Sequence, residues 1–367
     1  MEPKLIELAR VGAGLTQGQL AKKLGKSQPF VSQVEHGEKD IPSDLIPYWC
    51  DACDVPESFL LRGRLPLDDS VSAMVHRRMK TLPAKPHHLA NAQVKMRVLE
   101  VDSLLAEIDL VPSLEIPRVP VGTGPVDAAA YVRRSWRVPA GPLPNLVELI
   151  ESTGIPVVLM NCFHPKQSAT SHPGTLCDWV ITVNDSHPAS RRRYTLAHEL
   201  GHVVLRHEAV IAPDDAERSI LEVQADAFAA ELLMPQDEAR RELRSITFRR
   251  LVLLKQRWRV SIAFLIRRAL DVGTIDPQWR KHLEIELSTQ PGGRRREPAE
   301  FEPEEPSLIR RMIEALQHEG LSIAEIASLA GMTERRLRMI YLREPDRPRL
   351  LDNAQRVVVE LPRPSAS

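Results

Sequence analysis

The stretch Tyr194-Thr-Leu-Ala-His-Glu-Leu-Gly-His202 decides how this chain is interpreted. On an α-helix, side chains four residues apart lie on one face, so His198 and His202 can bind one metal ion together. Glu199 follows His198 directly, where its carboxylate can reach a water molecule at the metal without being a ligand itself. The motif therefore predicts a metal-binding helix.

The surroundings of the motif favour this interpretation over the alternative, which is two surface histidines on an amphipathic helix. Apolar side chains flank the motif, so we expect a mostly buried helix over residues 190–207. A buried His-Glu-His cluster would be costly without a partner. Glycine at position 201 disfavours a helix by ~1 kcal/mol relative to Ala. Close approach by a neighbouring strand or helix would explain why a glycine stands there.

A metal site needs a third protein ligand, and Glu222 is the leading candidate. It belongs to a helix expected over residues 217–233, and Asp226 follows one turn later on the same face. Two histidines and a glutamate form a known catalytic zinc set, and Asp226 would accept a hydrogen bond from the second N–H of His198. The pattern predicts one Zn²⁺ ion. The competing carboxylates are Glu217 and Glu231.

Three such ligands leave one coordination position for water, whose pKa a zinc ion lowers towards ~7. Glu199 would take the proton of this water as it attacks a carbonyl group, and would deliver the proton to the leaving amine. The arrangement predicts hydrolysis of a peptide bond. A donor for the tetrahedral oxyanion should also exist. Conceivable donors are His207, Tyr194 and His172.

The residues before the motif predict a small sheet within a mainly helical chain. Residues 155–160 and 178–183 have the apolar, β-branched composition of strands. Residues 162–176 between them have the composition of a loop. The fold class expected is therefore mainly α with a small β-sheet, that is, α+β.

Residues 5–60 carry a second, independent pattern. Thr16 is placed to cap a helix that stops at Gly25. Lys26-Ser27 then starts a second helix, expected over Gln28 to His36 and ending at Gly37. Two short helices across a three-residue turn predict a helix-turn-helix whose second helix enters the major groove of double-stranded DNA. A five-helix bundle used for protein contacts is the alternative. The predicted DNA-contacting residues are Thr16, Gln17, Ser27, Gln28, Ser32 and Gln33.

Residues 307–343 carry a weaker copy of this pattern. Ser322 begins a helix that stops at Gly331, and a second helix follows that would display Arg335, Arg336 and Arg338. Two interpretations stay open for this segment: a second helix-turn-helix, or a plain helical hairpin.

Composition limits the classes of protein that this chain can be. Lys+Arg and Asp+Glu both number 49, so the net charge of zero excludes histone-like binding of nucleic acid through bulk charge. Aromatic residues make up only 4%, which argues against base-stacking surfaces for single strands. No uninterrupted apolar run of membrane-spanning length and no signal-peptide pattern occurs. We expect a cytoplasmic protein that does not bind membranes.

The motifs of residues 5–60 resemble those of Cro/repressor-type (XRE-family) DNA-binding domains. Residues 127–270 are similar to the ImmA/IrrE metallopeptidases. The segments that carry the two resemblances are Leu15-Thr16-Gln17, Leu20-Ala21, Ser27-Gln28 and Glu35-His36-Gly37, then Tyr194 to His202 and Glu222-Val-Gln-Ala-Asp-Ala-Phe-Ala-Ala-Glu-Leu-Leu-Met-Pro235.

The resemblance implies a zinc-dependent, gluzincin-like fold in which His198, His202 and Glu222 bind zinc and Glu199 is the catalytic acid and base. Members of that family typically cleave a repressor in response to stress. The domains expected are a helix-turn-helix at 1–65, a helical connector and proline-rich linker at 66–125, the metallopeptidase at 126–290, a linker at 291–306, the helical segment 307–343 and a tail at 344–367.

The sequence thus favours a DNA-binding transcriptional regulator with a zinc endopeptidase that cuts a repressor-like protein or the chain itself. The alternatives are a transcription factor with a structural or metal-sensing zinc site, and a regulator of a toxin–antitoxin or mobile-element module. A homodimer on a palindromic DNA site is a further expectation.

Overall fold

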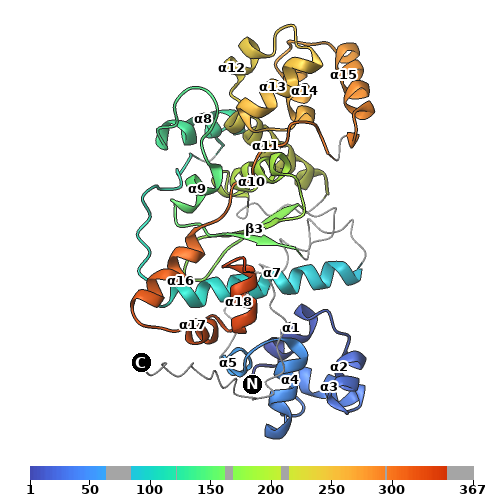
Figure 1. Ribbon diagram of the computed structural model, residues 1–367, viewed down its shortest axis with the longest axis vertical. Helices are drawn as coiled ribbons and strands as arrows, with labels where there is room; N and C mark the ends of the chain where they lie inside the picture. Colours follow the sequence, from blue (N-terminus) through green and yellow to red (C-terminus); the bar gives the residue numbers. More distant parts are fainter. Residues whose placement is uncertain (63–83, 121, 162–167, 208–214, 294–295, 345–367) are drawn as a thin grey trace, which may run out of the picture.

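The computed structural model describes residues 1–62, 84–120, 122–161, 168–207, 215–293 and 296–344 (Figure 1). Helices dominate these residues, and three short strands form one sheet, which confirms the expected fold class. None of the helices in the described ranges combines the length and the apolar character needed to cross a membrane.

The N-terminal bundle consists of α1 (Pro3–Gly12), α2 (Gln17–Leu24), α3 (Gln28–Glu35), the short 3₁₀ helix η1 (Ser43–Leu45), α4 (Ile46–Cys53) and α5 (Glu57–Leu60). Thr16 and Gln19 form a reciprocal capping box at the start of α2, which ends at Gly25 with a left-handed φ of 62°. The Ser27 hydroxyl caps α3. Trp49 and Phe59 lie at the centre of the bundle, both fully buried.

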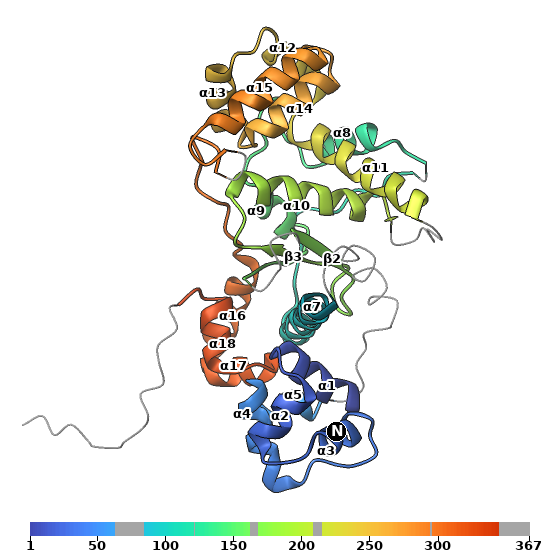
Figure 2. The same cartoon turned by 90° about the vertical axis from the view of Figure 1, so that its right-hand side faces the viewer.

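The long helix α7 (Ala84–Leu105) lies between this bundle and the sheet (Figures 1 and 2). It contacts α1 on one side and β3 and the C-terminal helices on another. Its apolar residues are divided accordingly: Met96 and Leu99 belong to the core of the bundle, whereas Val98 and Val101 belong to the core shared with the C-terminal helices. The helix therefore joins two separate cores.

The sheet contains β1 (Val157–Met160), β2 (Ala169–His172) and β3 (Val180–Asn184) in the order β1-β3-β2. β1 runs parallel to β3, and β2 runs antiparallel to it. The helices on the far side of the sheet from α7 are α8 (Pro125–Ser135), α9 (Leu146–Glu151), α10 (Ala189–Val204), α11 (Asp215–Leu233), α12 (Gln236–Glu242), α13 (Phe248–Trp258), α14 (Ile262–Asp271) and α15 (Pro277–Thr289) (Figures 1 and 2).

The expectation of a loop throughout residues 162–176 is wrong for residues 169–172, which form strand β2. The sequence Ala-Thr-Ser-His has no apolar alternation, so the strand gives no local signal. It is held instead by pairing with β3, in which Thr170 lies opposite Thr182. Nonlocal hydrogen bonds therefore place this strand.

Residues 296–306, which we expected to be a linker, lie along the helices of the central region. The carboxylate of Glu297 accepts hydrogen bonds from backbone N–H groups at the start of α14, and Glu300 does so at the start of α10. Glu304 does the same at the start of α9 and also pairs with the buried Arg193. Each carboxylate thus lies at the positive end of a helix dipole. Lys255 is fully buried and binds two of these glutamates.

The C-terminal helices are α16 (Leu308–His318), α17 (Ile323–Ala330) and α18 (Glu334–Ile340). They pack against α7 and share one apolar core with it and with β1 and β3. Ser322 and Glu325 form a capping box at the start of α17, Gly331 ends that helix with φ 70°, and Thr333 caps α18. The expected pair of short helices is therefore present.

Candidate metal centre and helix-turn-helix surface

The side chains of the candidate metal site come from two antiparallel helices, α10 and α11, that approach each other closely. The cause is Gly201: a Cβ atom there would lie 3.0 Å from the ring of Phe228 and 3.3 Å from the Cα atom of Ala225. Such distances are tighter than ordinary side-chain contacts, so only glycine allows this packing without adjustment. This confirms the expectation that a neighbouring element explains the glycine within the motif.

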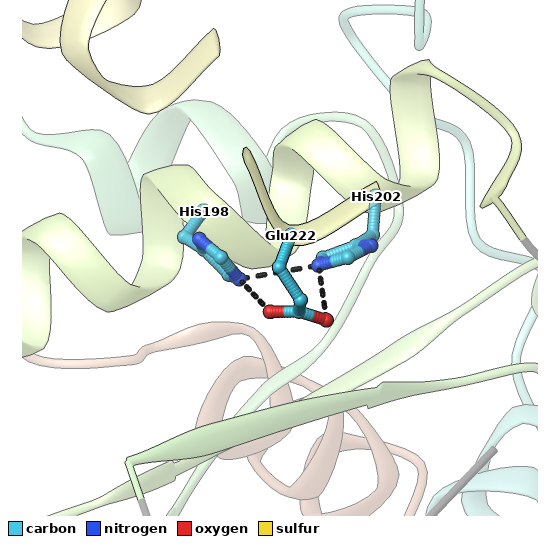
Figure 3. A group of neighbouring side chains, drawn as sticks. All are labelled: His198, His202 and Glu222. Carbon is cyan, nitrogen blue, oxygen red and sulfur yellow. Dashed lines mark hydrogen bonds and ion pairs between the residues drawn. The ribbon is translucent and has the colours of Figure 1, made fainter. Parts of the chain in front are cut away.

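His198, His202 and Glu222 converge on one point (Figure 3). The Nε2 atoms of the two histidines are 3.1 Å apart, and Oε2 of Glu222 lies 3.2 Å from Nε2 of His198. The other carboxylate oxygen of Glu222 is 3.5 Å from Nε2 of His202. Two ligands of a tetrahedral zinc ion, each at about 2.1 Å, would be about 3.4 Å apart. The three donors therefore fit a zinc ion by both chemistry and spacing.

His198 is supported from behind by an acidic group. Its Nδ1–H donates to Oδ1 of Asp226 at 2.8 Å, and the Tyr194 hydroxyl donates to the same oxygen. Burial alone would lower the pKa of His198, but hydrogen bonds to Asp226 and Glu222 and the nearby charge of Glu199 raise it to about 9. The surroundings of Nε2 thus favour positive charge, which suits a cation as well as a proton.

Glu199 lies on the same helix but points to the sheet. Its side chain is buried, at 2% exposure, and its Oε2 atom accepts hydrogen bonds from the backbone N–H and the hydroxyl of Ser171 on β2. These bonds measure 2.9 and 2.8 Å. The edge strand β2 therefore fixes the carboxylate beside the two histidines.

The remaining candidates for this site have other partners. Glu231 binds the buried guanidinium of Arg268 and the backbone N–H of Gln236, which places it away from the histidines. Among the described residues, Glu222 is the carboxylate that the structure groups with His198 and His202, and Glu217 is not in that group. Of the conceivable oxyanion donors, Tyr194 binds Asp226, the fully buried His172 contacts the Thr170 hydroxyl, and His207 contacts His202.

Sequence reasoning missed Ser171 altogether, and it considered His207 only as an oxyanion donor and not as a partner of His202. Ser171 lies on the strand that the sequence did not predict. His207 follows α10, and Arg206 before it has a left-handed φ of 56°, which returns the chain towards His202. Because arginine is not a residue typical of that conformation, no turn signal marks this reversal.

On the helix-turn-helix, the predicted DNA-contacting residues lie along α2 and α3. Gln28 is exposed and donates a hydrogen bond of 2.7 Å to the side chain of Gln17. Gln17 in turn donates to Glu35, which forms a buried ion pair with Arg10 of α1. This chain of contacts presents the start of α3 in a fixed orientation.

The other predicted contact residues serve partly as helix caps. Thr16 and Ser27 are exposed, and their hydroxyls accept hydrogen bonds from backbone N–H groups of α2 and α3. Ser32 and Gln33 are half-buried on α3. All of these positions lie near the N-termini or on the outer face of the two helices, where phosphate and base contacts are made in this class of fold.

The fold and the site define a regulator that combines a DNA-binding helix-turn-helix with a peptidase-like domain. Residues 6–60 match the family model described as helix-turn-helix. Residues 150–270 match the family model described as IrrE N-terminal-like domain, and this range contains every side chain of the candidate metal site. The two matches agree with the two resemblances that the motifs give. No curated protein matches the chain.

Proposed function

We propose that this chain is a DNA-binding transcriptional regulator whose IrrE-like domain is a zinc endopeptidase. Its substrate would be a regulatory protein, either a repressor or the chain itself, cleaved in response to stress. The convergence of His198, His202 and Glu222, with Glu199 beside them, is the observation that carries this proposal. In the helix-turn-helix, Gln28 and its neighbours on α3 would contact DNA bases.

In this proposal His198, His202 and Glu222 hold the zinc ion, and Asp226 orients His198 through its Nδ1–H. A bound zinc ion would supply Lewis acidity towards a peptide carbonyl and would make water more acidic. Glu199 would accept the proton of the attacking water on its carboxylate and would return it to the leaving amine. Ser171 would keep that carboxylate in place, through the two hydrogen bonds described above.

A second candidate function is metal sensing or structural metal binding without hydrolysis. It is favoured by the same two hydrogen bonds, since Oε2 of Glu199 is already engaged by Ser171 and the side chain is buried. In that case the protein would bind zinc and DNA and would cleave no partner. A regulator of a toxin–antitoxin or mobile-element module would behave in the same way.

Glu199→Gln separates the two functions, because it removes the proton acceptor and leaves the three ligands intact. Zinc-loaded wild-type and variant chains would be incubated alone and with a proteome-derived peptide library, and new N-termini would be identified by mass spectrometry. We expect cleavage by the wild type, loss of at least ~10²-fold in the variant, and equal zinc content. Equal cleavage by both proteins would remove Glu199 from the reaction, and no cleavage by either would favour the second candidate.

The ligand assignment is tested by Glu222→Ala, with Glu217→Ala on the same helix as the matched control. We expect about one zinc ion per wild-type chain, a large loss of zinc affinity in the first variant and no change in the second. Metal analysis after dialysis against a zinc buffer gives the answer. The opposite ranking of the two variants would move the third ligand to Glu217.

A further inference from the structure

His207 lies directly behind one of the two converging histidines. Its side chain is 6% exposed, and its Nδ1 atom is 2.8 Å from Nδ1 of His202. Its other ring nitrogen, Nε2, is 3.1 Å from the carbonyl oxygen of the Gln224 side chain. The rings of His202 and His207 meet edge to face, at an angle of 76°. Three polar side chains thus form a continuous row that ends at the site.

The hydrogen atoms in this row can be placed by elimination. An amide carbonyl oxygen only accepts, so Nε2 of His207 must carry the hydrogen that faces Gln224. A neutral imidazole has one N–H, which leaves Nδ1 of His207 as an acceptor. The hydrogen between the two Nδ1 atoms therefore belongs to His202. Nε2 of His202 is then left with its lone pair, and this is the atom that faces His198 and Glu222.

We propose that His207 and Gln224 form a positioning relay that sets His202 in the tautomer that binds metal through Nε2. The inference rests on the metal site of the proposed function, but not on hydrolysis. His207 is a positioning residue here, since it acts through His202 and does not itself face the convergence point.

The backbone supports this assignment. Arg206 has a left-handed φ of 56°, a conformation that is unfavourable for a residue other than glycine. The reversal at Arg206 brings His207 back against the end of α10, where its ring is buried beside His202. Gln224 comes from α11, the helix that also carries Glu222 and Asp226. Helix α11 therefore supplies the third ligand, Glu222, together with Asp226, which supports His198, and Gln224, which supports His202 through His207.

The two converging histidines are supported in different ways. Nδ1–H of His198 donates to a carboxylate, Asp226, whereas Nδ1–H of His202 donates to a neutral ring. A carboxylate orients the imidazole and also increases the basicity of its Nε2 atom. The neutral relay orients His202 without adding charge, so the site carries less negative charge than two carboxylate supports would give it.

The test compares His207→Phe, which keeps a ring but removes the acceptor, with His207→Asn, whose Oδ1 can replace the Nδ1 acceptor. His187→Phe is the matched control, because it changes another buried histidine before α10. Zinc affinity of the full chain would be measured by competition with a chelator. We expect a loss of about 10–100-fold for His207→Phe, a loss within about threefold for His207→Asn, and no change for His187→Phe.

A spectroscopic measurement on the metal-free protein distinguishes the effect of His207 on the His202 tautomer from its effect on side-chain packing. Nitrogen-15 spectra of histidine-labelled chains report which ring nitrogen carries the hydrogen. We expect Nδ1–H at His202 in the wild type and in His207→Asn. In His207→Phe the hydrogen should move to Nε2, where it can be donated to Glu222. Gln224→Leu, a milder change at a half-buried position, should shift the same equilibrium in part and weaken zinc binding several-fold.

Two results would overturn the relay: unchanged zinc affinity in His207→Phe while Glu222→Ala loses zinc, or equal losses in His207→Phe and His207→Asn. If His207→Phe does not fold, Gln224→Leu decides, and an unchanged His202 spectrum with unchanged affinity would contradict the proposal. Failure of the proposed function looks different. In that case the wild type would bind zinc, the relay variants would bind zinc more weakly as expected, and no peptide would be cleaved.

Discussion

Two helix hairpins at opposite ends of the chain share one local design and have different surroundings. Both α2–α3 and α17–α18 begin with a capping box, turn at a left-handed glycine and continue into a capped second helix. In the first hairpin, Gln28 at the start of the second helix is exposed. In the second hairpin, Thr333 and Arg336 at the start of α18 contact Asp54 of the N-terminal bundle.

The charges on α18 are largely taken up within the molecule. Arg336 is mostly buried, with 12% of its side chain exposed, and lies 3.6 Å from the fully buried carboxylate of Glu100 on α7. Arg338 pairs with Glu334 and Glu344, and Arg335 lies 3.8 Å from Asp54. Capping residues and glycine therefore specify a hairpin, but the charged neighbours determine whether its second helix is available to DNA. The hairpin α17–α18 therefore connects the bundle to α7, and we expect that it does not read DNA.

The largest expected effect on stability is that of Glu100→Gln, which removes a buried contact between α7 and the second hairpin. Glu100 accepts a hydrogen bond from Tyr341 and faces both Arg97 and Arg336, all in a buried environment. Removing its charge leaves two buried guanidinium groups without their anion, so the free energy of unfolding should fall by about 3–5 kcal/mol. Urea unfolding measures the change.

Glu334→Gln on α18 is the control for this variant. Its carboxylate pairs with Arg338 at the surface, so we expect a change below about 0.5 kcal/mol. If Glu100→Gln were as mild as the control, apolar packing alone would hold the hairpin, and the charges on α18 would have no structural role.

A specific difference in DNA affinity is the next largest effect. Gln28→Ala removes an exposed amide at the start of α3, and its loss should weaken binding to a selected DNA site by about 10–100-fold. Arg335→Ala removes an exposed cation from α18 and should leave this affinity unchanged. Fluorescence anisotropy, with a site selected from random duplexes, measures both. An equal loss for Arg335→Ala would show that the second hairpin also contacts DNA.

The two hairpins also show how far local sequence leads. Caps and glycines, which act within four residues, predict both hairpins, because each signal lies next to its effect. The helix that carries His198 and His202 has no side-chain cap and is predicted by the spacing of its motif and its apolar flanks. The partners of Arg336 are more than two hundred residues away in the sequence, and the pattern of α18 gives no sign of them. The same holds for Glu297, Glu300 and Glu304, which lie in a Pro- and Glu-rich stretch and bind the starts of distant helices.

At the candidate site, the motif spacing predicts which residues converge but only part of what holds them. Glu222 and Asp226 could be chosen because one helical face carries both. Ser171 and the contact of His207 with His202 could not be foreseen, since Ser171 lies on a strand without apolar alternation and His207 follows a left-handed arginine. These two contacts are placed by tertiary structure, so the motif alone does not reveal them.

The smallest expected effect is a difference in stability between the two capping boxes, of which only the second contains a charged residue. Thr16→Ala and Ser322→Ala should each cost about 1 kcal/mol at pH 7, because each removes the acceptor for one helix N–H. The partner of Thr16 is the neutral Gln19, whereas the partner of Ser322 is Glu325, whose pKa is lowered by hydrogen bonds from the Ser322 hydroxyl and backbone N–H.

A carboxyl group with a lowered pKa in the folded state contributes stability above its unfolded pKa, about 4.3, and loses this contribution as the pH falls through the folded value. The cost of Ser322→Ala should therefore decrease as the pH falls from 7 towards 3, and the cost of Thr16→Ala should stay constant. Urea unfolding at a series of pH values measures both differences. Parallel pH dependence in the two variants would mean that the Glu325 charge contributes nothing to its cap, and that the two boxes are equivalent in energy as well as in geometry.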